Sequence, residues 1–220
     1  MNYEFAVIER TDCPICGSKQ LKQVYTQQQD DRYGQPDYYD ILECQNAECQ
    51  IAFVKQEISS ADLPKLYSKY YHHRARSIRN NQISESVFFF LKTLRDWAYN
   101  ANNLYSRVRR GQKVLDVGCG YGPSKIFLKQ RKIEWVGLEV DPLKVSMNKQ
   151  KGLNCHQGML EEFESRNKEK FDVILLNQVI EHISDPIAFF EVLGRTLYKN
   201  GSVILSTPNY ESKYRHLHGS

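Results

Sequence analysis

The sequence lacks any apolar run of the length that a membrane-spanning helix needs, and its first residues, MNYEFAVIER, do not resemble a secretory signal. It also lacks internal repeats and low-complexity tracts. What remains is a 220-residue chain with 41% hydrophobic residues, which suffices for one sizeable core and one small appendage. We therefore expect a cytoplasmic protein without a membrane span.

The sequence also lacks a strong excess of either charge. Its 30 Lys and Arg residues nearly balance 26 Asp and Glu residues, so the net charge is +4. Short basic runs occur at 74–79 and 107–110. A dedicated nucleic-acid binder usually concentrates its basic residues on one face, so we interpret these runs as solvated helix faces or loops. A nucleic-acid partner is disfavoured but stays open as an alternative.

Cysteine is sparse, and four of the six cysteines form two pairs: Cys13 with Cys16, and Cys44 with Cys49. Without an export signal, disulfides are disfavoured. Two such pairs predict four thiolates around one tetrahedral zinc ion, although the four residues between Cys44 and Cys49 exceed the usual two. A closed four-thiolate site stabilises the fold and performs no chemistry. Free thiols are the alternative interpretation.

Composition divides the chain into three regions. Residues 1–58 hold the paired cysteines among short β-like runs and predict a small zinc-binding module of the zinc-ribbon type. Residues 59–112 predict a helical connector, because apolar residues recur at helical spacing within 84–101. Residues 113–220 alternate β-rich runs with helical stretches, which indicates an α/β core of parallel strands joined by right-handed crossover helices.

The segment 114–122 reads VLDVGCGYG and is the most informative part of the core. Its Asp116, Gly118, Gly120 and Gly122 form the pattern D-x-G-x-G-x-G at the end of a predicted strand. Glycines let the backbone turn sharply and approach a ligand closely, and Asp116 can accept hydrogen bonds from an ammonium group. The spacing differs from the G-x-G-x-x-G of dinucleotide-binding folds.

The next predicted strand, 135–139, ends in an acidic side chain, Glu139. A carboxylate at this place can accept hydrogen bonds from both hydroxyls of a ribose. The glycine loop and Glu139 together predict a nucleoside-containing ligand, whereas a tight turn without a ligand is the alternative. Asp141 is expected to cap the following helix ahead of Pro142.

With these features the region from Lys113 to Asn209 resembles the class I methyltransferases, which use S-adenosylmethionine. The resemblance implies a Rossmann-like, doubly wound, mainly parallel sheet with strand order 3-2-1-4-5. It also implies that Met159 and Leu160 flank the adenine. Asn177 and Gln178 would line the methionine end of the cofactor. The cysteine module together with the connector resembles a bacterial methyltransferase group often linked to sugar, polysaccharide or secondary-metabolite modification.

His182 follows the fourth strand of the resemblance and is our predicted general base, because an unperturbed imidazole titrates near neutral pH. The alternative is that His182 caps or packs its loop. After the fifth strand, which we expect to end near Ser206, the family continues with a helix and an antiparallel hairpin. That hairpin is missing here, so we expect a C-terminally truncated core. Its exposed edge strand would need cover from the N-terminal module or from a partner chain in a homo-oligomer.

The leading hypothesis is therefore an S-adenosylmethionine-dependent methyltransferase that acts on a small-molecule acceptor, such as a sugar or related metabolite. An RNA methyltransferase is one alternative, with the zinc module and the basic runs gripping the RNA backbone. A non-catalytic module that binds S-adenosylmethionine is the other.

Overall fold

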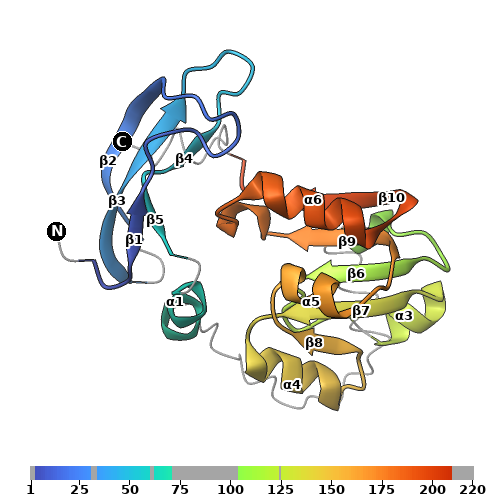
Figure 1. Ribbon diagram of the computed structural model, residues 1–220. Coiled ribbons are helices and arrows are strands. Elements are labelled where there is room, and N and C mark those ends of the chain that lie inside the picture. The colour runs from blue at the N-terminus through green and yellow to red at the C-terminus, as the bar shows by residue number, and fades with distance from the viewer. Residues whose placement is uncertain (1–2, 31–33, 60–61, 71–103, 124, 210–220) are drawn as a thin grey trace, which may run out of the picture.

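The computed structural model describes residues 3–30, 34–59, 62–70, 104–123 and 125–209. The predicted helix within 84–101 lies outside these residues. Two parts are visible in Figure 1, an N-terminal module of antiparallel strands and a larger layered domain. In the described residues, no helix is long and apolar enough to cross a membrane.

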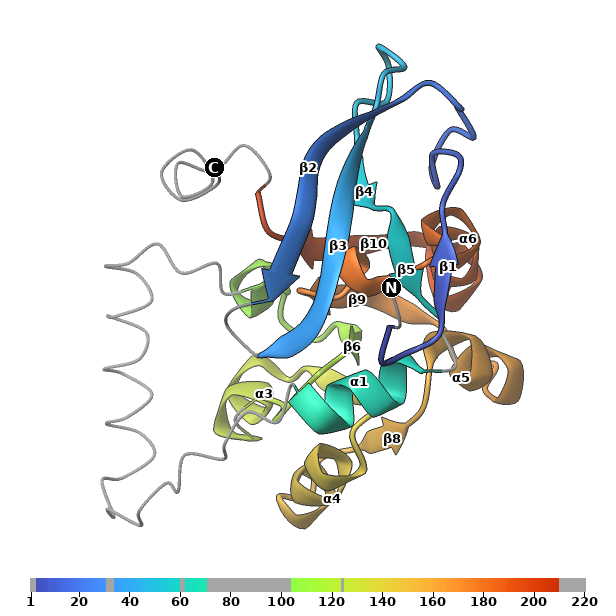
Figure 2. The ribbon, with the colours of Figure 1, turned by 90° about the vertical axis from the view of Figure 1, so that its left-hand side faces the viewer.

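The N-terminal module consists of two small antiparallel sheets followed by a helix. Its strands are β1 (Val7–Glu9), β2 (Leu21–Asp30), β3 (Gln35–Cys44), β4 (Ala52–Val54) and β5 (Gln56–Ile58). Strands β2, β3 and β4 form one sheet in that order, and β1 pairs with β5 in the other. The long β2 and β3 run side by side in both views (Figures 1 and 2). Helix α1 (Leu63–Tyr70) follows the module.

The larger domain is built around a five-stranded sheet in the order β10-β9-β6-β7-β8, and every neighbouring pair is parallel. Its strands are β6 (Lys113–Val117), β7 (Glu134–Glu139), β8 (Cys155–Gln157), β9 (Phe171–Asn177) and β10 (Leu197–Ser206). Counted along the domain this is the predicted order 3-2-1-4-5, so the predicted doubly wound architecture is confirmed. The order places the end of the first strand, β6, between those of β7 and β9.

Helices cover both faces of the sheet, as alternating side chains require. The helical elements are η1 (Leu104–Arg107), α3 (Lys125–Arg131), α4 (Pro142–Gln150), α5 (Leu160–Arg166), η2 (Ile180–His182) and α6 (Pro186–Thr196). Leu115 and Val117 of β6 join a core cluster with residues of α5 and α6. Val114 joins a second cluster with residues of η1, α3 and α4. The two clusters pack on opposite faces of the central strands, beneath the loops that follow.

Two aspartates start helices in this domain. The carboxylate of Asp141 accepts a hydrogen bond from Leu143 N at 2.9 Å, which confirms the predicted cap ahead of Pro142. The carboxylate of Asp185 likewise accepts one from Ala188 N at 3.0 Å, at the start of α6. These caps fix where the loops after β7 and β9 end.

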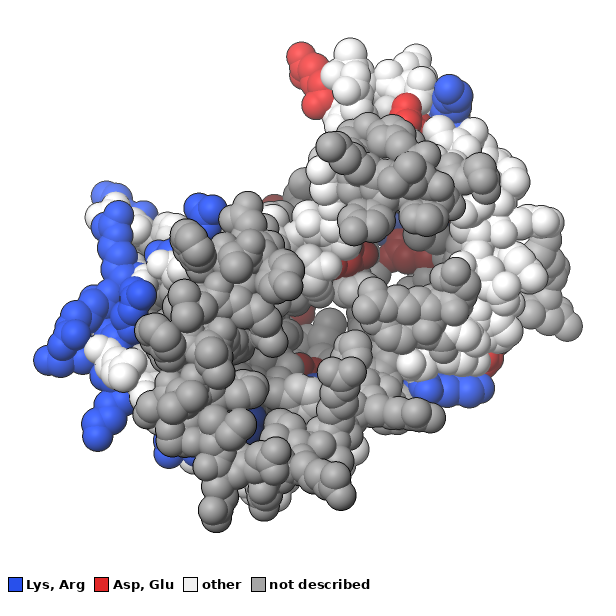
Figure 3. Space-filling model, turned by 180° about the vertical axis from the view of Figure 1, so that it is seen from behind, with Lys and Arg blue, Asp and Glu red and all other residues white. Residues whose placement is uncertain are grey.

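Lys and Arg side chains gather on one side of the molecule, where α3 and the start of β6 lie (Figure 3). This basic cluster comprises the exposed residues Arg107, Arg109, Arg110, Lys129, Arg131 and Lys132. Its two segments are joined by hydrogen bonds, including one from Gly111 N to Arg131 O at 3.0 Å. Arg107, Arg109 and Arg110 come shortly before β6, and Lys129, Arg131 and Lys132 come shortly before β7. The cluster therefore lies at the amino ends of these parallel strands, opposite the glycine loop at the carboxyl end of β6.

Candidate cofactor site and cysteine cluster

The glycine loop follows β6 directly and is shaped by left-handed backbone. Gly118, Gly120 and Gly122 have φ angles of +66°, +56° and +65°, a region that side chains disfavour. The loop also touches the segment after β9, because a Cβ on Gly118 would lie 2.7 Å from Val179 Cγ2. Glycine is thus required at position 118 both by its conformation and by a close approach.

Glu139, at the end of β7, is bound directly to this loop. Its Oε2 accepts a hydrogen bond from Gly120 N at 2.8 Å, while Oε1 accepts from Val140 N at 2.9 Å and Asp141 N at 3.0 Å. The side chain is 6% exposed. Because a carboxylate has about four acceptor positions, these three hydrogen bonds leave room for one more donor.

Asp116 lies beneath the loop and is fully engaged in the core. The hydroxyl of Tyr105 donates a hydrogen bond to its Oδ2, and Trp135 Nε1 lies 3.4 Å from the same oxygen. Burial raises the pKa of Asp116 to about 7, against the opposing effect of the hydrogen bonds from Tyr105 and Trp135. The predicted contact with an ammonium group stays a prediction. In the structure, Asp116 is instead linked by these hydrogen bonds to Tyr105 of η1 and Trp135 of β7.

Met159 and Leu160, which the resemblance places beside the adenine, differ sharply in exposure. Met159 is 38% exposed, whereas Leu160 is 1% exposed and packs in the core cluster with α6. Gly158 N donates to Glu139 O at 3.1 Å, so this segment adjoins the end of β7. Met159 can therefore offer its side chain to a ligand near Glu139, while Leu160 can offer only its backbone.

Asn177 is the last residue of β9, the neighbour of β6, and Gln178 follows it. The Oδ1 of Asn177 accepts a hydrogen bond from Ser206 Oγ at 2.6 Å, and Gln178 N donates to Ser206 O at 2.9 Å. Gln178 has a φ of +56°, which is strained for a residue with a side chain. This strain ends the strand abruptly and turns the chain toward Val179, whose side chain packs on the glycine loop.

His182 ends the short helix η2, a few residues further along. His182 is an exposed residue, but the surrounding protein partly desolvates its imidazole, which lowers the pKa of His182, while the nearby Glu181 carboxylate acts to raise it. The Thr207 hydroxyl lies 3.3 Å from Glu181 Oε2, which connects this loop to the end of β10. A lowered pKa keeps the imidazole neutral near pH 7, as a proton acceptor must be.

Three residues that shape this region were not predicted from the sequence. Tyr105 and Trp135 hold Asp116, and Asn148 of α4 donates a hydrogen bond from Nδ2 to Gly120 O at 2.8 Å. Tyr105 carries no sequence signal, because it precedes the recognisable motif. Asn148 carries a weak sequence signal. It lies three positions after the buried Val145, so a polar amide falls on the apolar face of the helix.

A comparison with protein families bears directly on this geometry. The sequence matches the family described as "Methyltransferase domain" over residues 83–219, more than half of the chain. The chain belongs to this methyltransferase domain family. The match covers every strand of the parallel sheet and all of the predicted cofactor residues, and it confirms the resemblance to class I S-adenosylmethionine-dependent methyltransferases.

Individual relatives match over the same part of the chain. The ubiquinone biosynthesis O-methyltransferase of Aliivibrio fischeri (strain MJ11) is 31% identical over 120 residues, which are 52% of this chain and 49% of the relative. That of Erwinia tasmaniensis is 32% identical over 125 residues, 54% of this chain and 49% of the relative. The chain thus spans about half the length of these curated relatives.

Solved structures give a more distant likeness. A crystal structure of a SAM-dependent methyltransferase from Archaeoglobus fulgidus aligns with 24% identity and a TM-score of 0.42, covering 58% of this chain and 57% of that one.

The four paired cysteines lie ahead of the methyltransferase domain and converge on one point. All four Sγ atoms lie within 4.8 Å of one another, with 3.6 Å between Cys13 and Cys49 and 3.5 Å between Cys16 and Cys44. In a tetrahedral site with Zn–S bonds of about 2.3 Å, neighbouring sulfurs lie roughly 3.8 Å apart. The donor set and its spacing therefore fit zinc.

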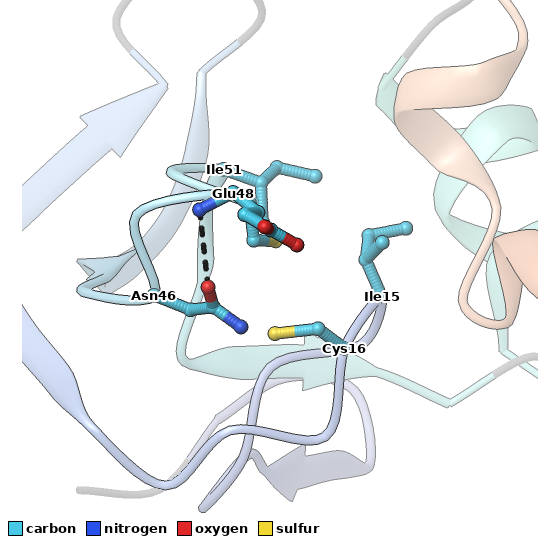
Figure 4. A pocket seen from close by; sticks show the side chains of 6 residues that line it. Ile15, Cys16, Asn46, Glu48 and Ile51 are labelled. Carbon is cyan, nitrogen blue, oxygen red and sulfur yellow. Dashed lines mark hydrogen bonds between the residues drawn. The ribbon is translucent and has the colours of Figure 1, made fainter.

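The wide spacing of the second cysteine pair is absorbed by a turn around Asn46. Its Oδ1 accepts a hydrogen bond from Glu48 N at 3.0 Å, and its carbonyl accepts one from Cys49 N at 2.9 Å (Figure 4). This turn brings Cys49 back to the other thiols despite the additional residues. The two cysteine turns border a hollow of about 530 Å³, toward which Ile15 and Glu48 project from opposite sides.

Proposed function

We propose that this chain transfers a methyl group from S-adenosylmethionine to a small-molecule acceptor, and that the carboxyl ends of β6, β7 and β9 bind the cofactor. The observation that carries the proposal is the hydrogen bond from Gly120 N to Glu139 Oε2 at 2.8 Å. It joins the glycine loop and the acidic strand end, the two features that the family's cofactor needs, into a single site.

The residues present fit such a cofactor. The glycines leave bare backbone beside the ends of β6 and β7. Glu139 has acceptor capacity for one further hydroxyl donor, which narrows the predicted contact from both ribose hydroxyls to one while Gly120 N stays bound. The exposed Met159 and the backbone of Leu160 would border the adenine, and Asn177 and Gln178 the methionine end.

When bound, S-adenosylmethionine supplies a methyl group that is already activated by a positively charged sulfur. The chain then has to hold an acceptor in line and exclude water. An oxygen acceptor must also lose a proton, and His182 is our proposed base because its imidazole is exposed just after β9 and its lowered pKa keeps it neutral near pH 7. Asp116 would act indirectly, by fixing the base of the loop through Tyr105 and Trp135.

The matched relatives support a small-molecule acceptor, since their names place them in ubiquinone biosynthesis as O-methyltransferases. We therefore propose a hydroxyl group as the attacking group, carried by a sugar or a phenolic metabolite. The RNA alternative gains no support from the basic cluster, because the cluster lies at the opposite end of β6 from the glycine loop.

The experiment that tests the proposal is transfer of label from methyl-labelled S-adenosylmethionine to a panel of acceptors that bear sugar or phenolic hydroxyls. We expect label in at least one acceptor of this panel. Label in RNA alone would contradict the acceptor class, and tight cofactor binding without transfer to any acceptor would favour the non-catalytic alternative.

For the N-terminal module we propose one structural zinc ion held by Cys13, Cys16, Cys44 and Cys49. The support is the convergence of four thiols, two of which, Cys13 and Cys44, are almost fully buried. Four protein ligands leave no open coordination position, so the ion would stabilise the module without taking part in catalysis.

A further inference from the structure

Helix α4 buries an amide group beneath the glycine loop. Asn148 is fully buried, among apolar neighbours that include Val145, Leu153 and Cys155. Burying an amide away from water costs free energy unless its hydrogen bonds are made, and Asn is a poor residue for a helix interior. An apolar side chain would pack here at lower cost, so the amide needs a reason.

That reason is the contact of Asn148 with the loop. Its Nδ2 donates a hydrogen bond to Gly120 O at 2.8 Å, and its Oδ1 lies 2.9 Å from the place where a Cβ on Gly122 would be. Oδ1 has no hydrogen-bond partner in the described part of the chain. The side chain is therefore oriented so that its NH₂ group binds Gly120 O, and this orientation leaves its own carbonyl oxygen without a hydrogen bond in the described part of the chain.

Gly120 is consequently held on both sides. Glu139 accepts from its N–H at 2.8 Å, and Asn148 donates to its carbonyl oxygen at the same distance. The next carbonyl, that of Tyr121, accepts a hydrogen bond from Lys151 Nζ at 2.8 Å, just past the end of α4. Two consecutive carbonyls of the loop are thus tied to the same helix, and the left-handed conformation of Gly120 is fixed from outside the loop.

We propose that Asn148 is a positioning residue for cofactor binding, acting by holding the glycine loop in the conformation that keeps Gly120 N on Glu139. We call the contact of Asn148 with Gly120 the clamp. The effect on cofactor binding rests on the proposed function, whereas the clamp itself does not. Asn148 has no exposed surface, so its side chain cannot contact a bound ligand directly. Its effect passes through Gly120, whose half-buried carbonyl would lose its 2.8 Å hydrogen bond and whose backbone would gain freedom at a positive φ.

The test compares Asn148→Ala with Thr196→Ala. Thr196 is also almost fully buried in a helix on the sheet, but its hydroxyl bonds to Val192 O within its own helix, away from the loop. The first readout is hydrogen exchange of the Gly120 amide in cofactor-free protein labelled with ¹⁵N-glycine, in which 12 glycines are followed. The second is the Kd for S-adenosylmethionine.

We expect Asn148→Ala to speed exchange at Gly120 about tenfold and to weaken cofactor binding by about tenfold, with Thr196→Ala close to wild type in both. In turnover, the KM for the cofactor should rise while kcat at saturation stays near the wild-type value. Should the alanine variant fail to fold, Asn148→Ser, which keeps a hydroxyl donor, replaces it and should show smaller changes of the same sign.

Unchanged exchange at Gly120, or an equal change in Thr196→Ala, would overturn the clamp. Faster exchange with unchanged cofactor affinity would overturn its role in binding. A wild-type protein that binds no S-adenosylmethionine would refute the proposed function instead, and the exchange experiment would still decide whether Asn148 holds the loop.

Discussion

The Tyr105 hydroxyl donates a hydrogen bond to Asp116 Oδ2, so a residue ahead of the methyltransferase sheet holds the carboxylate beneath the glycine loop. Desolvation of Asp116 dominates over this hydrogen bond and raises the pKa of the carboxyl to about 7. The pair thus gives the fold a titration near neutral pH that the motif alone does not reveal.

The raised pKa of Asp116 predicts a pH-dependent stability. Between about pH 4 and pH 7 the folded chain keeps a proton that the unfolded chain releases, so the free energy of unfolding should fall as pH rises and level off above pH 7. The drop between about pH 5 and pH 7 should be roughly 2–3 kcal/mol. Asp116→Asn should remove this slope in urea unfolding followed by tryptophan fluorescence. Asp185→Asn, at the start of α6, is the control that should keep it.

Replacing His182 tests the proposed base. His182→Gln should lower kcat by about 10²–10⁴-fold and leave the affinity for S-adenosylmethionine unchanged. In the wild type, activity should decline toward acid with a midpoint below the ordinary histidine pKa of 6.5, because partial desolvation lowers the pKa of His182. Glu181→Gln should move that midpoint to still lower pH, since Glu181 raises the pKa. Full activity of His182→Gln would leave His182 as a packing residue.

Metal analysis tests the zinc proposal. Purified protein should contain one zinc per chain, and Cys13→Ser should lose most of it and unfold at lower temperature. Cys155→Ser is a matched control, because Cys155 is equally buried but lies in β8, outside the cluster. Undiminished zinc in Cys13→Ser would exclude four-thiolate coordination.

Much of the fold could be predicted because its signals are local. Runs such as FDVILLN mark strands covered on both faces, and their alternation with helical stretches predicts parallel pairing. The strand order comes from the resemblance to the class I methyltransferases, and the sheet has that order. The Asp141 cap follows from a single dipeptide. The two cysteine pairs in the sequence predict that the four thiols converge. The turn at Asn46, which lets the wider pair fit, could not be predicted from them.

The contacts within the site could not be predicted in the same way, because they depend on tertiary neighbours. The sequence places Glu139 at a strand end, but only the fold shows three backbone N–H groups already bound to it. Leu160 lies in the expected segment, yet the phase of α5 turns its side chain into the core. The helical spacing from Val145 places Asn148 on the buried face of α4, but only the fold shows that this face meets the glycine loop.

The most direct test of the account is calorimetric titration of S-adenosylmethionine into the wild type and into Glu139→Ala, with Glu134→Ala at the exposed start of the same strand as the control. The wild type and the control should bind equally, and Glu139→Ala should bind about 1–3 kcal/mol more weakly, because an acceptor for a hydroxyl and the anchor of Gly120 are both lost. Equal binding by all three proteins would contradict the proposed cofactor site.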